Sequence, residues 1–184
     1  MHIVVAITGA SGIAYGVRLL EALKEAGAET SLVLSEDGEK VLRLETEWTP
    51  AGVRKIATRN YSNGNMAAPI ASGSRPFDAM AICPCSMSTA GKLAAGISDN
   101  LITRAASVAL KERRRLVVVP RETPMSSIHL RNLAVLAEAG AVVLPAAPAF
   151  YGKPGKVEDL VDFIAGRVLD VLGIPNKLYR RWAE

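Results

Sequence analysis

Aromatic residues are scarce in this chain. Its 184 residues include two Trp, four Tyr and three Phe, which together make 5% of the sequence. Proteins that bind single-stranded nucleic acids stack the bases on aromatic side chains, so this scarcity argues against such a partner. The net charge of +4, from 22 Lys and Arg against 18 Asp and Glu, is also too small to require a nucleic acid. It still leaves cations available for a small anion.

Cysteine and histidine are rarer still. Cys83 and Cys85 are the only cysteines and lie one residue apart, which excludes a disulfide framework. His2 and His129 are the only histidines, so the chain lacks the ligand set of a zinc site. We therefore expect no metal. We interpret both cysteines as packing residues, because free cysteines are usually buried.

Long hydrophobic runs are absent as well. The longest, at residues 139–150, is shorter than a membrane span and is interrupted by Pro145 and Pro148. The first residues, MHIVVAITGASG, do not follow the order of basic, apolar and small-residue regions that marks a signal peptide. These features predict a soluble cytoplasmic protein with no membrane partner.

The chain has enough apolar residues for one ordinary domain. Hydrophobic residues make 49% of the sequence, and 184 residues is a usual domain length. We expect a single domain over residues 1–184, with a C-terminal tail at about 174–184. Residues 2–8 (HIVVAIT) are an apolar, β-branched run typical of a buried strand. A Gly- and Ser-rich turn and an amphipathic helix at 14–26 follow, so the chain opens with a βαβ unit.

The same alternation continues to the end of the chain. Further strands are expected at 29–35, near 54–58, and at 79–83, 115–119 and 141–144, and helices at 36–47, 88–95, 100–113, 126–139 and 157–172. Strands that alternate with helices indicate a parallel sheet with right-handed crossovers. The fold class is therefore α/β: a single Rossmann-like (flavodoxin-like) three-layer domain with a parallel sheet and helices on both faces.

Open parallel sheets bind ligands beyond the carboxyl ends of their strands. After the first strand come Gly9, Ala10, Ser11 and Gly12, a turn that permits close approach of the backbone to an anion. It lacks the dinucleotide fingerprint, because Ser11 stands where the second Gly belongs. A purely structural turn remains an alternative, although such a turn does not require the hydroxyl.

Three hydroxyl side chains follow the strand expected at 79–83. Ser86, Ser88 and Thr89 precede a helix and are able to cap it or to donate hydrogen bonds to a phosphate. A helix needs only one such cap, so the pattern favours ligand binding over capping alone.

Arg121 and Glu122 form the most specific local feature. They follow an apolar strand and precede a helix, within the sequence PRETP. One interpretation is a solvated turn. The other is an arginine that holds phosphate beside a carboxylate that moves protons.

Arg104 and Lys111 lie seven residues apart on one helix and therefore share a face.

Taken together, the segments resemble the UbiX-type flavin prenyltransferases, a branch of the homo-oligomeric flavin-containing Cys decarboxylase superfamily. The resemblance covers nearly the whole chain. It is carried by ITGASGIAYG, VLSEDGEK, ASGS at 71–74, ICPCSMSTAGKLAAGISDNLITRAA, LKERRRLVVVPRETPMSSIHLRNL, PAAPAFYGKP and GRVLDVLGI. Ser107 departs from the pattern, since many relatives carry Asp there.

The resemblance implies a reaction. A dimethylallyl group from dimethylallyl monophosphate is joined to N5 and C6 of reduced FMN, and prenylated FMN and phosphate are formed for use by a UbiD-type decarboxylase. It also implies a homo-oligomer, a dodecamer, with FMN at subunit junctions. Enzymes that ionise allyl diphosphates through Mg²⁺ carry Asp-rich motifs, and this sequence has no Asp-Asp pair, which is consistent with a metal-independent reaction.

The resemblance also implies site residues. FMN is expected at Gly9, Ala10, Ser11, Ser35, Ser86, Met87, Ser88, Thr89 and Arg121. The donor is expected at Arg104, Lys111, Arg121, Tyr151, Arg167 and Trp182. Glu122 and Ser11 are the expected catalytic residues, which move a proton to the phosphate or from C6 of the flavin.

Two alternatives remain open at this stage. The first is an FMN-dependent decarboxylase of the same superfamily, such as the phosphopantothenoylcysteine type. Those enzymes carry a catalytic His in the first half and a PASANT strand exit, whereas this chain has only His2 in a strand and reads CPCSMST. The second is a flavin carrier, which requires the FMN loops but no Arg121–Glu122 pair.

Overall fold

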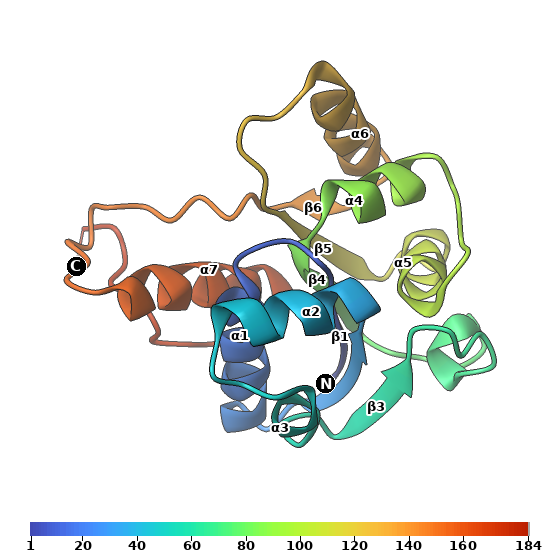
Figure 1. Cartoon of the computed structure of the whole chain (residues 1–184), viewed down its shortest axis with the longest axis horizontal. Coiled ribbons are helices and arrows are strands. Elements are labelled where there is room, and N and C mark those ends of the chain that lie inside the picture. The colour runs from blue at the N-terminus through green and yellow to red at the C-terminus, as the bar shows by residue number, and fades with distance from the viewer. Residues whose placement is uncertain (184) are drawn as a thin grey trace.

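The computed structural model describes residues 1–183, so the last position of the expected tail, 184, lies outside the described residues. Six strands form one sheet in the order β3-β2-β1-β4-β5-β6 (Figure 1). The strands are β1 (His2–Ile7), β2 (Glu29–Leu34), β3 (Arg59–Ser62), β4 (Ala79–Cys85), β5 (Arg115–Pro120) and β6 (Val142–Val143). The helices are α1 (Ile13–Glu25), α2 (Glu36–Glu45), α3 (Pro50–Arg54), η1 (Pro69–Ala71), α4 (Met87–Ala94), α5 (Leu101–Lys111), α6 (Ser127–Glu138) and α7 (Val157–Leu172).

Neighbouring strands are parallel in every pair of the sheet. The chain starts at β1, builds outward through β2 and β3, and then returns to place β4 on the other side of β1. The connections after β1 and β4 therefore leave in opposite directions. This arrangement opens a crevice at the carboxyl ends of these two strands.

Helices cover both faces of the sheet. Ile3, Val5 and Ile7 of β1 pack in one core with α1 and α7, and the alternate residues Val4 and Ala6 pack in a second core with α4 and α5. This division follows from the alternation of side chains along a strand. The predicted three-layer α/β class is confirmed.

One predicted element is wrong. Residues 54–58 do not form a strand, because α3 occupies Pro50–Arg54 and the edge strand β3 begins only at Arg59. Thr49 caps α3 by accepting a hydrogen bond from the Gly52 amide, and Pro50 fits the first helical position. β3 is mostly exposed, so it lacks the apolar pattern that marks the other strands.

The predicted start of α2 at residue 36 is confirmed. Ser35 caps this helix by accepting a hydrogen bond from the Gly38 amide at 3.0 Å. α2 ends at Glu45 because Thr46 is extended.

Among residues 1–183, no helix combines the length and the apolar character that crossing a bilayer demands.

Close packing of α1 on β4 gives a first prediction. A Cβ atom added at Gly16 would lie 2.2 Å from the Cys83 carbonyl oxygen, so Gly16→Ala must displace α1. We expect a loss of about 1–3 kcal/mol in the free energy of unfolding, measured by urea denaturation. Gly91→Ala in α4 is the matched control, because its Cβ would meet only the amide nitrogen of Asn132, at 3.3 Å. A Gly16→Ala protein as stable as this control would contradict the prediction.

Candidate functional site

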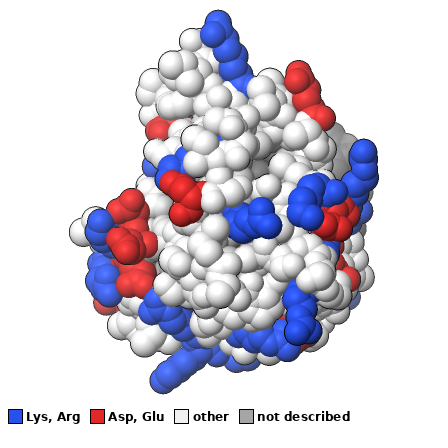
Figure 2. Space-filling view, turned by 90° about the vertical axis from the view of Figure 1, so that its right-hand side faces the viewer, with Lys and Arg blue, Asp and Glu red and all other residues white. Residues whose placement is uncertain are grey.

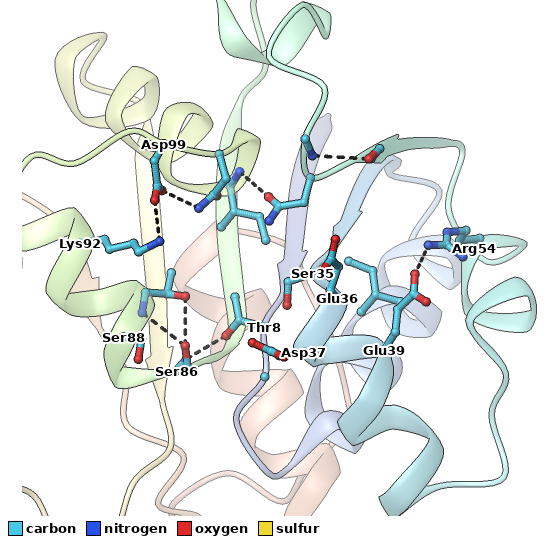
Figure 3. Close-up of a pocket in the computed structure, with 18 residues that line it drawn as sticks. Thr8, Ser35, Glu36, Asp37, Glu39, Arg54, Ser86, Ser88, Lys92 and Asp99 are labelled. Carbon is cyan, nitrogen blue, oxygen red and sulfur yellow. Dashed lines mark hydrogen bonds and ion pairs between the residues drawn. The ribbon is translucent and has the colours of Figure 1, made fainter.

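A cleft of about 580 Å³ lies at the carboxyl ends of β1, β2 and β4 (Figure 3). It therefore occupies the crevice that the sheet order creates. One wall comes from the start of α2 and the other from the start of α4. Residues 62–64, Asp99, Asn100 and Ile102 add to the lining. Five of the residues expected at FMN line it: Gly9, Ser35, Ser86, Ser88 and Thr89. Its volume is within the usual range of small-molecule sites.

Thr8 fixes the floor of the cleft. Its side chain is buried, and its hydroxyl donates to the Pro84 carbonyl at 2.9 Å while it accepts from the Ser86 amide at 2.8 Å. These two hydrogen bonds fix the position of the loop after β1 relative to the loop after β4. The turn after β1 also lies close to the start of α2, because a Cβ atom added at Gly9 would lie 2.5 Å from Cβ of Asp37.

The hydroxyl cluster at α4 divides into two parts. Ser86 caps α4 by accepting from the Thr89 amide at 3.3 Å, and the Ser86 and Thr89 hydroxyls lie 3.0 Å apart (Figure 3). Ser88 is exposed and makes no side-chain hydrogen bond to the described residues. The cleft therefore presents a capped helix N-terminus with one spare hydroxyl, an arrangement suited to an anion. Met87 is buried in the core beneath it.

Both cations in the cleft have acidic partners. Lys92 Nζ lies 2.6 Å from a carboxylate oxygen of Asp99, and Arg54 pairs with Glu39 (Figure 3). Lys92 lies on α4, near the hydroxyl cluster, and is the cation best placed for a phosphate there. The described residues contain no group of three or more His, Cys, Asp and Glu side chains suited to a metal.

Glu45 closes the other helix N-terminus at this edge. Its carboxylate accepts hydrogen bonds from the Gly12 amide at 2.8 Å and the Ile13 amide at 3.1 Å. A carboxylate at these amides satisfies the preference of α1 for negative charge. Sequence reasoning missed Glu45, because it lies more than 30 residues from this turn and belongs to an ordinary amphipathic helix. A side chain of the protein therefore already occupies the free amides at the start of α1, in the turn after the first strand.

Ser11 and Arg121 meet beside the cleft. Arg121 Nε donates to the Ser11 carbonyl at 3.0 Å, so the turn after β1 and the exit of β5 are in contact. Glu122 lies next to them in sequence, and its carboxylate accepts from the Thr123 amide at 3.1 Å. Ala10, Ser11, Met87 and Arg121 lie outside the lining of the cleft.

Tyr15 joins this group and was not singled out from the sequence. A Cβ at Gly12 would lie 2.8 Å from the Tyr15 ring and 3.8 Å from Cγ of Arg121, so Gly12 leaves space for both side chains. Burial and the neighbouring Cys83 raise the pKa of Tyr15, which the Arg121 guanidinium partly offsets. Its phenol is therefore neutral at neutral pH.

Arg104 and Lys111 lie together on α5, as their spacing predicts. Arg104 Nε donates to the Ala71 carbonyl at 2.9 Å, and Lys111 pairs with Glu112 near Gly73. Both side chains thus face the segment at 71–73. Figure 2 shows that charged side chains on this face form small groups with uncharged surface between the groups, and that the lower edge carries mostly basic side chains.

Tyr151, Arg167 and Trp182 form a separate group at α7 and the tail. The Tyr151 and Trp182 rings pack edge to face with centroids 5.2 Å apart. Arg167 Nη1 lies 3.2 Å from an Asp170 carboxylate oxygen. α7 packs on one face of the sheet and α5 on the other (Figure 1). One chain therefore does not bring all the expected donor-binding residues together.

Three comparisons place the chain among known proteins. A family profile described as Flavoprotein matches residues 1–169. The "Flavin prenyltransferase UbiX" of Thermoplasma acidophilum is 53% identical over 182 residues, which cover 99% of this chain and 100% of that protein.

Solved structures give the same picture. AnUbiX (PadA1), in complex with FMN and dimethylallyl pyrophosphate, matches with a TM-score of 0.98 and 46% identity over 100% of this chain and 97% of that one. A dodecameric FMN-dependent Ubix-like decarboxylase from Escherichia coli O157:H7 matches with a TM-score of 0.98 and 43% identity over 100% of both chains.

The buried cysteines give a second prediction. Burial raises the pKa of Cys85 to about 12, and burial together with Cys85 raises the pKa of Cys83 further. Only a thiolate reacts rapidly, so neither thiol should react with a disulfide reagent at pH 8 until the protein is denatured. Ala137→Cys, at an exposed position of α6, is the control for an accessible thiol. A native thiol that reacts as fast as this control would contradict the prediction.

Proposed function

The chain belongs to the UbiX-type flavin prenyltransferases, and we propose that it joins a dimethylallyl group to reduced FMN bound in the cleft at β1, β2 and β4. The observation that carries this proposal is the hydroxyl-lined crevice at the topological switch, in a chain that matches these enzymes over its full length. The proposed products are prenylated FMN and phosphate. The proposed recipient of prenylated FMN is a UbiD-type decarboxylase.

The residues of the cleft fit FMN. We assign the FMN phosphate to the N-terminus of α4, with Ser86, Ser88, Thr89 and Lys92 around it. The reason is electrostatic: Glu45 already occupies the amides of α1, so a phosphate there would face a carboxylate at close range. Reduced FMN supplies the nucleophilic N5 and C6 atoms. The flavin then extends toward Ser11 and Arg121, the expected place of transfer.

The donor is proposed to be dimethylallyl monophosphate. Its C–O bond breaks as the bond from the allyl C1 to N5 forms, and the electron pair leaves with the phosphate. Preplaced cations stabilise such a leaving group. The proton of N5 passes to the released phosphate. Closure of the second bond joins C6 to the allyl C3, adds a proton at the allyl C2 and releases the proton of C6. We assign the proton transfers to Glu122 with Ser11, and the phosphate contact to Arg121.

We propose that the complete donor site forms between copies of the chain. Arg104 and Lys111 lie on one face of the sheet, and Tyr151, Arg167 and Trp182 lie at the helix on the opposite face. One small phosphate cannot contact both groups of a single chain, because the sheet separates them. Assembly into a homo-oligomer, a dodecamer as in the Escherichia coli relative, supplies the missing group from another copy.

The activity itself is the third prediction. Anaerobic incubation with reduced FMN and dimethylallyl monophosphate should increase the mass of the flavin by one prenyl unit, detected by mass spectrometry. EDTA should leave the yield unchanged, and the diphosphate in a parallel reaction tests the choice of donor. Tight binding of unchanged FMN would instead indicate a flavin carrier. Release of CO₂ from an aromatic acid, without modification of the flavin, would indicate a decarboxylase.

Glu122 gives the fourth prediction. Glu122→Gln removes a proton-transferring carboxylate but keeps its size, so the rate of prenylation should fall by a factor of about 10²–10⁴. FMN binding, followed by flavin fluorescence, should be retained. Glu138→Gln, at an exposed carboxylate at the end of α6, is the matched control. Full prenylation activity in Glu122→Gln would exclude the assigned role.

A further inference from the structure

We propose that Asp170 is a positioning residue, which orients Arg167 and fastens the tail at 174–183 so that Trp182 stands against Tyr151. This inference rests on the proposed function, because it concerns the donor-binding residues of that site. Asp170 lies in the last turn of α7, and the tail folds back along this helix (Figure 1). The contacts that carry the inference all converge on one carboxylate.

Both oxygens of Asp170 accept several hydrogen bonds. Oδ1 accepts from Arg181 Nη2 and from Asn176 Nδ2, each at 2.9 Å. Oδ2 accepts from the Tyr179 hydroxyl, from Arg167 Nη1 at 3.2 Å and from Arg181 Nη1 at 3.3 Å. Three of the four partners belong to the tail and one to the expected donor site. A single side chain therefore couples the two.

The tail is also shaped to reach this carboxylate. Gly166 lies one turn before Asp170, and a Cβ there would lie 2.6 Å from the Tyr179 ring. Asn176 Nδ2 donates to the Gly166 carbonyl at 3.2 Å as well as to Asp170. The absence of a side chain at Gly166 thus lets the tail lie directly on α7.

A row of aromatic rings connects the tail at Tyr179 with Tyr151 and Trp182, two residues of the expected donor site. The Tyr179 ring packs on Phe163 with centroids 4.9 Å apart, Phe163 on Tyr151 at 6.0 Å, and Tyr151 on Trp182 at 5.2 Å. Arg181, the residue before Trp182, is held by both oxygens of Asp170. Loss of the Asp170 carboxylate would remove the ion pair of the residue next to Trp182 and the hydrogen bond of Tyr179 at one end of this row.

The exposure of Arg167 suits an anionic substrate. Asp170 is one carboxylate between two guanidiniums, those of Arg167 and Arg181. The Arg167 side chain is 45% exposed and that of Asp170 only 18%. The carboxylate is therefore covered while Arg167 remains accessible to a phosphate. Asp170 fixes the direction of Arg167 without cancelling its attraction for the donor.

The protonation state supports this geometry. Burial alone would raise the pKa of Asp170, but hydrogen bonds from Arg181, Tyr179 and Asn176 outweigh burial and hold the pKa below its ordinary value. Burial and the bond to Asp170 raise the pKa of Tyr179. The carboxylate is thus ionised and the phenol neutral at neutral pH, as the hydrogen bonds require.

The test, our fifth prediction, is Asp170→Asn in the full chain. Asparagine turns donor hydrogens toward at least one of the present donors and removes the charge between the guanidiniums. The KM for dimethylallyl monophosphate should rise about tenfold, the effect of losing a hydrogen bond to a charged group, and kcat should change much less. Trypsin should also cleave the tail at Lys177 faster in the variant than in the unmodified chain, and mass spectrometry follows this cleavage.

Controls separate positioning from stability. Asp162→Asn removes another α7 carboxylate, one that pairs with Arg18 away from the tail, and should leave KM and tail cleavage unchanged. Asp170→Glu should recover part of the KM. Tyr179→Phe deletes one contact of Asp170, together with the contacts of the Tyr179 hydroxyl to Arg167 and Arg181, and tests the coupling of the tail to Arg167 if Asp170→Asn does not fold. An unchanged or lower KM in a folded Asp170→Asn protein overturns the inference.

The outcome also remains distinct from that of the proposed function. If the unmodified chain fails to prenylate FMN, the proposed function fails, while faster tail cleavage in Asp170→Asn still measures the fastening of the tail. If the unmodified chain prenylates FMN and both the KM and the cleavage rate of the variant match those of Asp162→Asn, only the inference about Asp170 fails.

Discussion

The hydroxyl of Thr8 joins the two halves of the sheet where the chain reverses its direction of growth. It is buried between the turn after β1 and the turn after β4 and bonds to the Pro84 carbonyl and the Ser86 amide. An unpaired polar group at this depth costs about 1–3 kcal/mol, so these bonds hold both turns in one arrangement. The cleft, the capped start of α4 and the contact between Ser11 and Arg121 all lie around this point.

At the carboxyl edge of the sheet, the position of negative charge follows from the N-termini of two helices. Both α1 and α4 begin at this edge of the sheet, and the N-terminus of each helix favours negative charge. Glu45 supplies that charge at α1 from within the chain, whereas α4 has only hydroxyl caps. The same physical preference therefore gives a closed turn in one place and a position suited to a ligand in the other. The tail uses the opposite arrangement, in which a covered carboxylate at Asp170 organises two guanidiniums.

Much of the fold could be predicted because its signals are local. The alternation of apolar strands and amphipathic helices gave the layers, and α7 was predicted with its observed bounds, Val157–Leu172. Gly173, just after α7, adopts the left-handed conformation that ends helices. The strand expected at 54–58 was wrong because β3 is a short, exposed edge strand, paired through its backbone to β2. Backbone pairing without an apolar face leaves little trace in a sequence.

The chain's residue types and their order are sufficient for the α/β class, the hydroxyl-rich turns and the family, because each depends on neighbours within a few positions. The site depends on folding. Glu45 reaches Gly12, Arg121 reaches Ser11 and Asp170 gathers Tyr179 and Arg181 only when distant segments are packed together. The separation of Arg104 and Lys111 from Arg167 is likewise a property of the sheet between them. Spacing along the chain predicts which residues share an element, while the packing of elements determines which side chains meet.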